Sequence, residues 1–203
     1  MTPYFSDDYW SNPTRPAINT FERGVPFGVP FAPTPFRATF HVKAGSVEVA
    51  REVPITFRYV KDIYNGDKRM ELNVVPAFSV RTTPSLLVAP IAGASAAKPL
   101  EREVHVAVTN GTKGAADATV ALDVPAGWKA TPTTAAVSFS REDESLSARF
   151  IVTAPAQVKT GDYTLRASVT SSSTGAERFT AGYQEIEYPH IQRRQVMKQR
   201  RRR

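Results

Sequence analysis

Apolar and polar residues alternate one by one through much of this chain. In residues 36–43 every second residue is apolar. Successive side chains of a β-strand point to opposite faces, so this period of two predicts a half-buried strand. Residues 44–46 (Ala-Gly-Ser) then supply a turn, and residues 47–53 are predicted to pair back on the first strand as a hairpin.

The same pattern recurs along the chain, with turn residues in between. Asn65-Gly66 and Asn110-Gly111 are dipeptides that favour tight turns. No window has the period of a helix, so helix is expected to be scarce. Further strands are predicted at 55–59, 70–74, 78–80, 86–89, 104–108, 118–124, 137–139, 146–152, 163–169 and after residue 175 up to Tyr188. This pattern predicts an all-β fold of two tandem immunoglobulin-like β-sandwich modules.

Two aromatic residues have predicted places in such a sandwich. Tyr163 follows the turn residues Gly161-Asp162 at the head of a late strand. That is the place of the corner tyrosine of immunoglobulin-like folds, so its hydroxyl is expected to bond back to the main chain. Trp128, which follows a turn and enters a strand, is expected to lie in the core.

Composition divides the chain into four predicted parts. Residues 1–35 form an arm, 36–84 the first sandwich module, 85–191 the second, and 192–203 a disordered basic tail. Thr82-Thr83-Pro84 marks the predicted boundary between the modules. The chain has no window close to the roughly 18 apolar residues of a membrane span, and Met1–Trp10 does not resemble an export signal.

The arm is rich in both proline and aromatic residues. It holds seven of the 16 prolines and seven of the 20 aromatic residues of the chain. Proline removes backbone donors and disfavours helix, so the arm is expected to be irregular. Disordered linkers are poor in aromatic residues, so we also expect the arm to pack on the first sandwich or on a partner domain.

The net charge of +7 comes from one end of the chain. Of the 26 Lys and Arg residues, seven lie in 192–203, so the other 191 residues carry 19 basic and 19 acidic side chains. A basic run of this kind binds phosphate backbones non-specifically, but no stacking platform or basic groove accompanies it, so nucleic-acid binding is not favoured. The candidate polyanion contacts are Arg193, Arg194, Lys198, Arg200, Arg201, Arg202 and Arg203.

The residue pattern does not predict a catalytic, metal or cofactor site. The chain has no cysteine, no Gly-x-Ser-x-Gly elbow and no glycine-rich phosphate loop. His41, His105 and His190 each stand alone, whereas a zinc site needs three or four ligands; a structural or docking role is expected for His190. The acidic residues 142–144 lack the spacing of a calcium loop and are predicted to form a solvated turn.

Sugar binding is the candidate function that the aromatic residues leave open. Tyr4, Tyr9 and Trp10 in the arm could stack on sugar rings or contact another domain. Asn110-Gly111-Thr112 matches the glycosylation acceptor pattern, but the predicted turn already explains this tripeptide.

Several segments of the second module resemble a known family. The strand closing on Thr109-Asn110, together with LDVPAGW (122–128), FIVTAP (150–155) and GDYTL (161–165), resembles the bacterial immunoglobulin-like domain associated with alpha-galactosidases, the NPCBM-associated domain. This resemblance implies an immunoglobulin-like fold without catalytic residues of its own.

A second resemblance joins two distant segments. FRYVKDIYNGDKRMELNVVPAF (57–78) and GYQEIEYPHI (182–191) resemble the region after the catalytic domain of bacterial PIG-L-like (LmbE-like) N-acetylglucosaminyl deacetylases. The catalytic domain of that family carries a His-Pro-Asp-Asp zinc motif, which this sequence lacks. The resemblance therefore implies a non-catalytic accessory region that works with a PIG-L-like catalytic domain in cis or in trans. It also implies a secreted or periplasmic parent protein.

Overall fold

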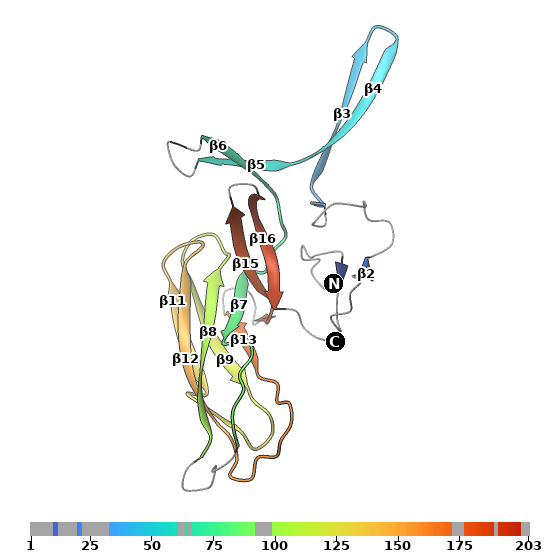
Figure 1. Cartoon of the computed structure of the whole chain (residues 1–203). Helices are drawn as coiled ribbons and strands as arrows, with labels where there is room; N and C mark the ends of the chain where they lie inside the picture. The colour runs from blue at the N-terminus through green and yellow to red at the C-terminus, as the bar shows by residue number, and fades with distance from the viewer. Residues whose placement is uncertain are drawn as a thin grey trace. The chain divides into compact units, whose positions relative to one another are not determined.

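The structure is a computed structural model that describes residues 10–11, 20–21, 33–60, 64, 66–91, 99–171, 177–188 and 191–199 (Figure 1). Every regular element in this part of the chain is a β-strand, which confirms the predicted all-β fold. The described residues hold no helix that is long and apolar enough to cross a membrane. The chain divides into two compact units: Met1–Val75 with Gln184–Met197, and Pro76–Tyr183 with Lys198–Arg203.

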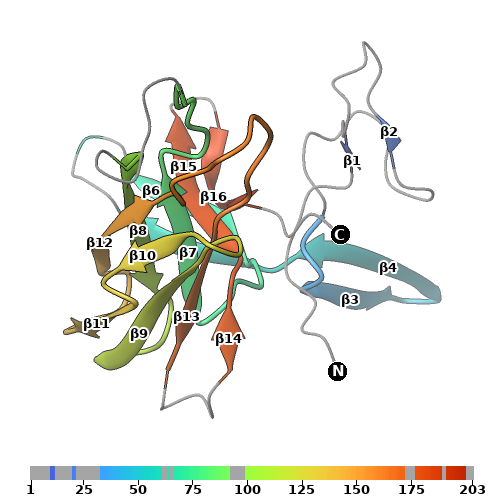
Figure 2. The same cartoon turned by 90° about the horizontal axis from the view of Figure 1, so that it is seen from below.

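The second unit is a β-sandwich of two four-stranded sheets. Figure 1 shows these sheets face to face, and Figure 2 views them from below. One sheet has the strand order β10 (Lys129–Thr131), β12 (Ser145–Thr153), β8 (Glu101–Asn110), β7 (Phe78–Thr83). The other has the order β11 (Thr134–Phe139), β9 (Ala116–Asp123), β13 (Arg166–Thr170), β14 (Arg178–Phe179). All strand pairs within both sheets are antiparallel.

The space between the two sheets is filled by the apolar side chains that the alternation placed on one face. The inward row of β8 is Val104, Val106 and Val108, and those of β9, β12 and β13 are buried in the same way. The ring of Phe78 lies 5.9 Å from that of Phe139 and 5.5 Å from that of Phe179, measured between centroids. The predicted inward rows are therefore confirmed in β8, β9 and β12 and at Ala167 and Val169 of β13, whereas Tyr163 is exposed and lies before β13 begins at Arg166.

Strand β7 lies in this sandwich and not in the first module, where the sequence placed it. Its Phe78 and Val80 are fully buried in the core, and β7 pairs with β8. The backbone N–H of Gly111 donates to the carbonyl of Ala77 at 2.8 Å, next to the start of the strand. The units therefore part at Val75–Pro76, and not at the predicted boundary of residues 82–84.

The first unit is built from two-stranded sheets. They are β1 (Trp10–Ser11) with β2 (Thr20–Phe21), β3 (Arg37–Ala44) with β4 (Val47–Pro54), β5 (Thr56–Val60) with β6 (Asp67–Glu71), and β15 (Gly182–Tyr188) with β16 (Ile191–Gln199). The predicted hairpin of 36–53 is confirmed, and Gly45 at its turn has a φ of 62° that favours glycine. The described part of residues 36–84 does not form the first sandwich that the pattern predicted.

Two further predictions about the chain differ from the structure. The described residues 85–91 contain no strand, and the side chains of Leu86 and Val88 are exposed. The apolar run suggested burial, but Pro84 lacks the N–H that would continue the ladder beyond β7. The prediction of a disordered tail is also wrong over residues 192–199, because they lie in β16.

Candidate functional site

A group of charged and aromatic side chains gathers where β5 and β6 meet β15. Tyr59 on β5 and Lys68 on β6 are cross-strand partners, so their side chains share one face of the hairpin. The carboxylate of Glu187 on β15 accepts a hydrogen bond from Lys68 Nζ at 2.7 Å and one from the Tyr59 hydroxyl at 3.4 Å. The Glu187 side chain is 12% exposed and that of Lys68 29%. We call these residues, with Arg193 and Arg194, the Glu187 cluster.

Two arginines of β16 extend this cluster. The guanidinium carbon of Arg193 lies 5.3 Å from the centroid of the Tyr59 ring, and Arg193 also forms an ion pair with Glu185 on β15. Arg194 forms an ion pair with Glu71 on β6, at 3.2 Å. These contacts explain why the basic segment is ordered: nearby carboxylates offset its charge, and an aromatic face accepts one guanidinium.

The protonation of Tyr59 reflects its surroundings. Burial raises the pKa of the Tyr59 hydroxyl above its ordinary value, and the negative charge of Glu187 raises it further. The hydroxyl therefore stays protonated at neutral pH and serves as a donor to Glu187. A neutral phenol, an ammonium and a carboxylate that bond to one another act as a clamp between hairpins. This arrangement holds the hairpins together and does not activate a nucleophile.

The corner of the sandwich has the predicted tyrosine geometry. The hydroxyl of Tyr163 donates to the carbonyl of Lys159 at 2.9 Å, which confirms the predicted bond back to the main chain. The ring of Tyr163 lies 4.9 Å from that of Trp128, with 47° between the ring planes. Trp128 packs in turn against the buried core but is only partly buried, so the prediction that it lies in the core is confirmed in part.

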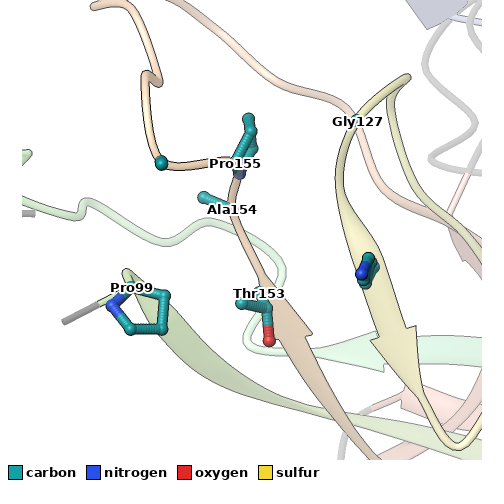
Figure 3. A pocket seen from close by; sticks show the side chains of 7 residues that line it. Pro99, Gly127, Thr153, Ala154 and Pro155 are labelled. Carbon is teal, nitrogen blue, oxygen red and sulfur yellow. The ribbon is translucent and has the colours of Figure 1, made fainter. Parts of the chain in front are cut away.

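A shallow depression of about 260 Å³ lies near this corner (Figure 3). Its lining presents polar and apolar surface in similar amounts, and Lys129 supplies the one charged side chain. The lining residues are Pro99, Gly127, Lys129, Thr153, Ala154, Pro155 and Ala156. The Lys129 ammonium can contact a polar group of a ligand. The lining holds no His, Asp or Glu that could act beside it as a general base.

Two of the three predicted single histidines, His41 and His105, belong neither to the lining of this depression nor to the Glu187 cluster. His41 contacts Glu48 at 3.3 Å, and the ring of His105 contacts Glu103 at 2.7 Å; both pairs are exposed. His190 lies outside the described residues. Within the described ranges, no group of three or more His, Cys, Asp or Glu side chains could hold a metal ion.

Two motifs that suggested chemistry have structural roles. The Asn110 side chain is fully buried; its amide donates to the carbonyls of Gly114 and Arg141 at 2.9 and 3.0 Å, and its oxygen accepts from Thr112. These bonds support the turn interpretation of Asn110-Gly111-Thr112 over glycosylation. In the acidic turn, the Glu144 carboxylate accepts hydrogen bonds from the N–H and hydroxyl of Ser140, and the pKa of Glu144 is lowered by them.

The other candidate site residues lie at or beyond the edges of the described chain. Tyr4 and Tyr9 lie outside the described residues, and Trp10 belongs to β1. Lys198 belongs to β16, and residues 200–203 lie outside the described ranges. Of the seven candidate polyanion contacts, Arg193 and Arg194 are thus already engaged with carboxylates of this chain.

Sequence reasoning did not single out Tyr59, Lys68 and Glu187 as one site. Glu187 and Lys68 are 119 residues apart in the sequence, so alternation within each strand could not pair them. The available signal was the resemblance that grouped the segments 57–78 and 182–191. The Glu187 cluster is where these two segments meet.

The fold and its geometry define an all-β protein with an immunoglobulin-like sandwich. Residues 101–172, which run from β8 to just beyond β13, match the family described as the NPCBM-associated, NEW3 domain of alpha-galactosidase. This match confirms the resemblance of the second module. It covers about a third of the chain, so it identifies a domain and not the family of the whole chain.

The other comparisons add little to this picture. Seven chains among the solved structures match. One is the crystal structure of a FixG-related protein from Vibrio parahaemolyticus, at 13% identity and a TM-score of 0.39, covering 61% of this chain and 98% of that one. No curated protein matches.

Proposed function

We propose that this chain is a non-catalytic accessory region of a carbohydrate-active enzyme, which packs against or spaces the catalytic domain. The observation that carries this proposal is the match of residues 101–172 to a domain of alpha-galactosidase. The sandwich agrees with it, because its interior is filled by close-packed apolar side chains. Such a module works through its surfaces, and the enzyme's chemistry belongs to another domain.

The connection between the units supports a spacing role. The chain leaves the first unit at Val75–Pro76 and returns to it at Tyr183–Gln184, so the sandwich is inserted between two parts of the first unit. Two covalent connections restrict an inserted domain more than one flexible linker does.

The particular enzyme that we propose is a PIG-L-like N-acetylglucosaminyl deacetylase, in cis or in trans. The support is the resemblance of segments 57–78 and 182–191 to the region after that catalytic domain. Lys68 and Glu187 come from these two segments and form an ion pair at 2.7 Å. Contact of this kind is expected if both segments belong to one structural module of that family.

The test is an assay of the isolated chain with N-acetyl-amino-sugar substrates and zinc. The proposal predicts no turnover above the rate without protein, and turnover that a chelator abolishes would refute it. The adjoining coding sequence tests the choice of enzyme. A domain with a His-Pro-Asp-Asp motif is expected there, and a different carbohydrate-active domain would refute the deacetylase assignment while leaving the accessory role in place.

Sugar binding is a second candidate, which the association of the matched domain with alpha-galactosidase favours. It predicts saturable binding of an oligosaccharide by the chain. If the arm supplies the stacking surface, binding weakens when Trp10 is replaced by alanine. Titration of the chain and of this variant with galacto-oligosaccharides would test it, and equal affinity of the two would exclude Trp10 as the contact.

A further inference from the structure

The β3–β4 hairpin has one apolar and one polar face. Cross-strand partners of an antiparallel pair lie on the same face, and Val42 pairs with Val49, Ala44 with Val47. We call this side the apolar face; its members are Ala38, Phe40, Val42, Ala44, Val47, Val49, Val53 and one charged residue, Arg51.

The opposite side of the hairpin is typical of a solvated surface. Arg37 forms an ion pair with Glu52 at 2.7 Å, and His41 contacts Glu48 at 3.3 Å. Lys43 lies on the same side. The two strands therefore have the pattern of a sheet with one face in water and the other against an apolar partner.

The apolar face is nevertheless exposed in the described structure. Phe40 is 56% exposed, Val42 61%, Val47 60% and Val49 58%. An isolated two-stranded hairpin is marginally stable in water, and a contiguous exposed apolar surface marks a site of interaction. A cover over this face would stabilise the hairpin by removing these side chains from water.

We propose that the apolar face of the β3–β4 hairpin is a docking surface, and that its occupant is the segment Tyr4–Trp10 of the same chain. The proposal does not depend on the proposed function. It rests on the position of the segment along the chain, on its chemistry and on the size of the face.

The segment is tethered beside the hairpin. Thr34 is buried, and its hydroxyl donates to the carbonyl of Leu72 at 2.6 Å, which fixes the chain three residues before β3 begins. Trp10 is the cross-strand partner of Phe21, and the 12 residues between Phe21 and Thr34 span at most about 45 Å, whereas an eight-residue strand is about 26 Å long. The segment can therefore reach any point on the face, at the high effective concentration of a tethered ligand.

The chemistry of the segment complements that of the face. Four of its seven residues are aromatic, and Asp7 and Asp8 lie between them. No basic residue occurs before Arg15. Aromatic rings suit the valines and Phe40 of the face, and the two carboxylates suit Arg51, which is the cross-strand partner of Phe40.

The size of the face favours a tethered segment over a second copy of the chain. Two strands of eight residues present a face of about 26 by 10 Å, so two hairpins face to face would bury on the order of 500 Å². A stable interface between separate molecules buries about 1,000 Å² or more. A segment of the same chain needs less area, because its translational freedom is already restricted.

The test follows the environment of Trp10 in the full chain. The difference in fluorescence between the natural chain and Trp10→Phe isolates the emission of Trp10 from that of Trp128. The double variant Val42→Lys with Val49→Lys places two charges on one rung of the apolar face. His41→Lys with Ala50→Lys places two charges on the adjacent rung of the polar face and is the matched control.

The proposal predicts that Trp10 is protected from acrylamide in the natural chain and in the control, at all protein concentrations. The apolar-face variant should shift the Trp10 emission to the red and raise its quenching constant several-fold. Val42→Thr with Val49→Thr keeps the β-branched shape, so it should produce the same change in direction if the lysine variant loses the hairpin.

Two results would overturn the proposal. Trp10 that is fully quenched in the natural chain, or equally protected in the apolar-face variants and the control, shows that the segment does not dock there. Protection that disappears on dilution, with a matching change of mass in sedimentation, assigns the face to a second copy. A charge reversal adds a positive test: Arg51→Glu should weaken protection, and Asp8→Arg should restore it.

Discussion

The carboxylate of Glu187 accepts a hydrogen bond from the ammonium of Lys68 at 2.7 Å, although 119 residues separate the two positions. This contact joins the end of the chain to the β5–β6 hairpin. Lys68 precedes the sandwich in the sequence and Glu187 follows it, and both residues belong to the first unit. The first unit is therefore held together in part by a polar contact between segments that precede and follow the sandwich in the sequence.

Removal of the Glu187 carboxylate should loosen the first unit. Glu187→Gln takes the negative charge from Lys68, and we expect a loss of about 1–3 kcal/mol for a pair that is mostly buried. Hydrogen exchange should become faster in residues 56–71 and stay unchanged in β8 and β12. Glu103→Gln, which breaks an exposed ion pair on the sandwich, is the control. Equal exchange in both variants would contradict the role of the Glu187 cluster.

Truncation of Phe78 should destabilise the sandwich, because its ring packs on those of Phe139 and Phe179 in the core. Phe78→Ala should lower the free energy of unfolding by about 3–5 kcal/mol. Phe57→Ala, at an exposed position of β5, should cost much less. Urea unfolding of both variants measures the difference, and similar losses would contradict the assignment of β7 to the sandwich.

The corner hydrogen bond should make a smaller contribution. Tyr163→Phe removes the hydroxyl that donates to the Lys159 carbonyl and leaves the ring on Trp128. We expect a loss of about 0.5–1.5 kcal/mol, the net value of one hydrogen bond. Thermal unfolding measures it, and an unchanged midpoint would show that the corner bond does not stabilise the fold.

Substitution of the buried Asn110 should destabilise the sandwich more than loss of the corner hydrogen bond. Its amide donates two hydrogen bonds to carbonyls and its oxygen accepts two from Thr112. Asn110→Asp replaces a donor by an acceptor next to two carbonyls, so we expect a loss of at least about 2 kcal/mol. Thr109→Ser, at the half-buried neighbouring position, keeps the hydroxyl and is the control in the same unfolding experiment. A stable Asn110→Asp variant would contradict the structural role of this turn.

The acidic turn should give the sandwich a dependence on pH. Hydrogen bonds from Ser140 hold the pKa of Glu144 below the ordinary value of 4.5. A carboxyl whose pKa is lower in the folded state stabilises the protein above the unfolded-state pKa, and this contribution is lost as the pH falls through the folded-state value. The difference in unfolding midpoint between the natural chain and Glu144→Gln should therefore shrink below pH 4.5. Glu142→Gln leaves the bonds of Glu144 in place and is the control; a constant difference would contradict the effect.

Much of the sandwich could be predicted from the sequence because its information is local. The alternation in β8, β9 and β12 predicts which side chains face inward. In the first unit, Gly45 marks the turn of the β3–β4 hairpin in the same local way. The pairing of β7 with β8 could not be predicted in this way, because alternation gives a strand's faces but not its neighbours. The apolar run at 86–89 suggested a strand, because apolar composition alone does not show whether a segment has a neighbouring strand to pair with.

The candidate site was less accessible to prediction. Arg193 and Arg194 read as part of a solvated basic tail, since charge runs usually remain in water. Their order depends on Glu185 and Glu71, which are placed by the fold. Electrostatic partners that are distant in the sequence leave no periodic signal in either segment.

The most direct test of the accessory role is a calorimetric titration of this chain into the catalytic domain that the proposed function expects in the adjoining coding sequence. The proposal predicts saturable binding and a higher unfolding temperature of the catalytic domain in the complex. For a domain in the same polypeptide, the comparison is between the catalytic domain alone and the natural fusion. No binding and no stabilisation in either arrangement would contradict the account.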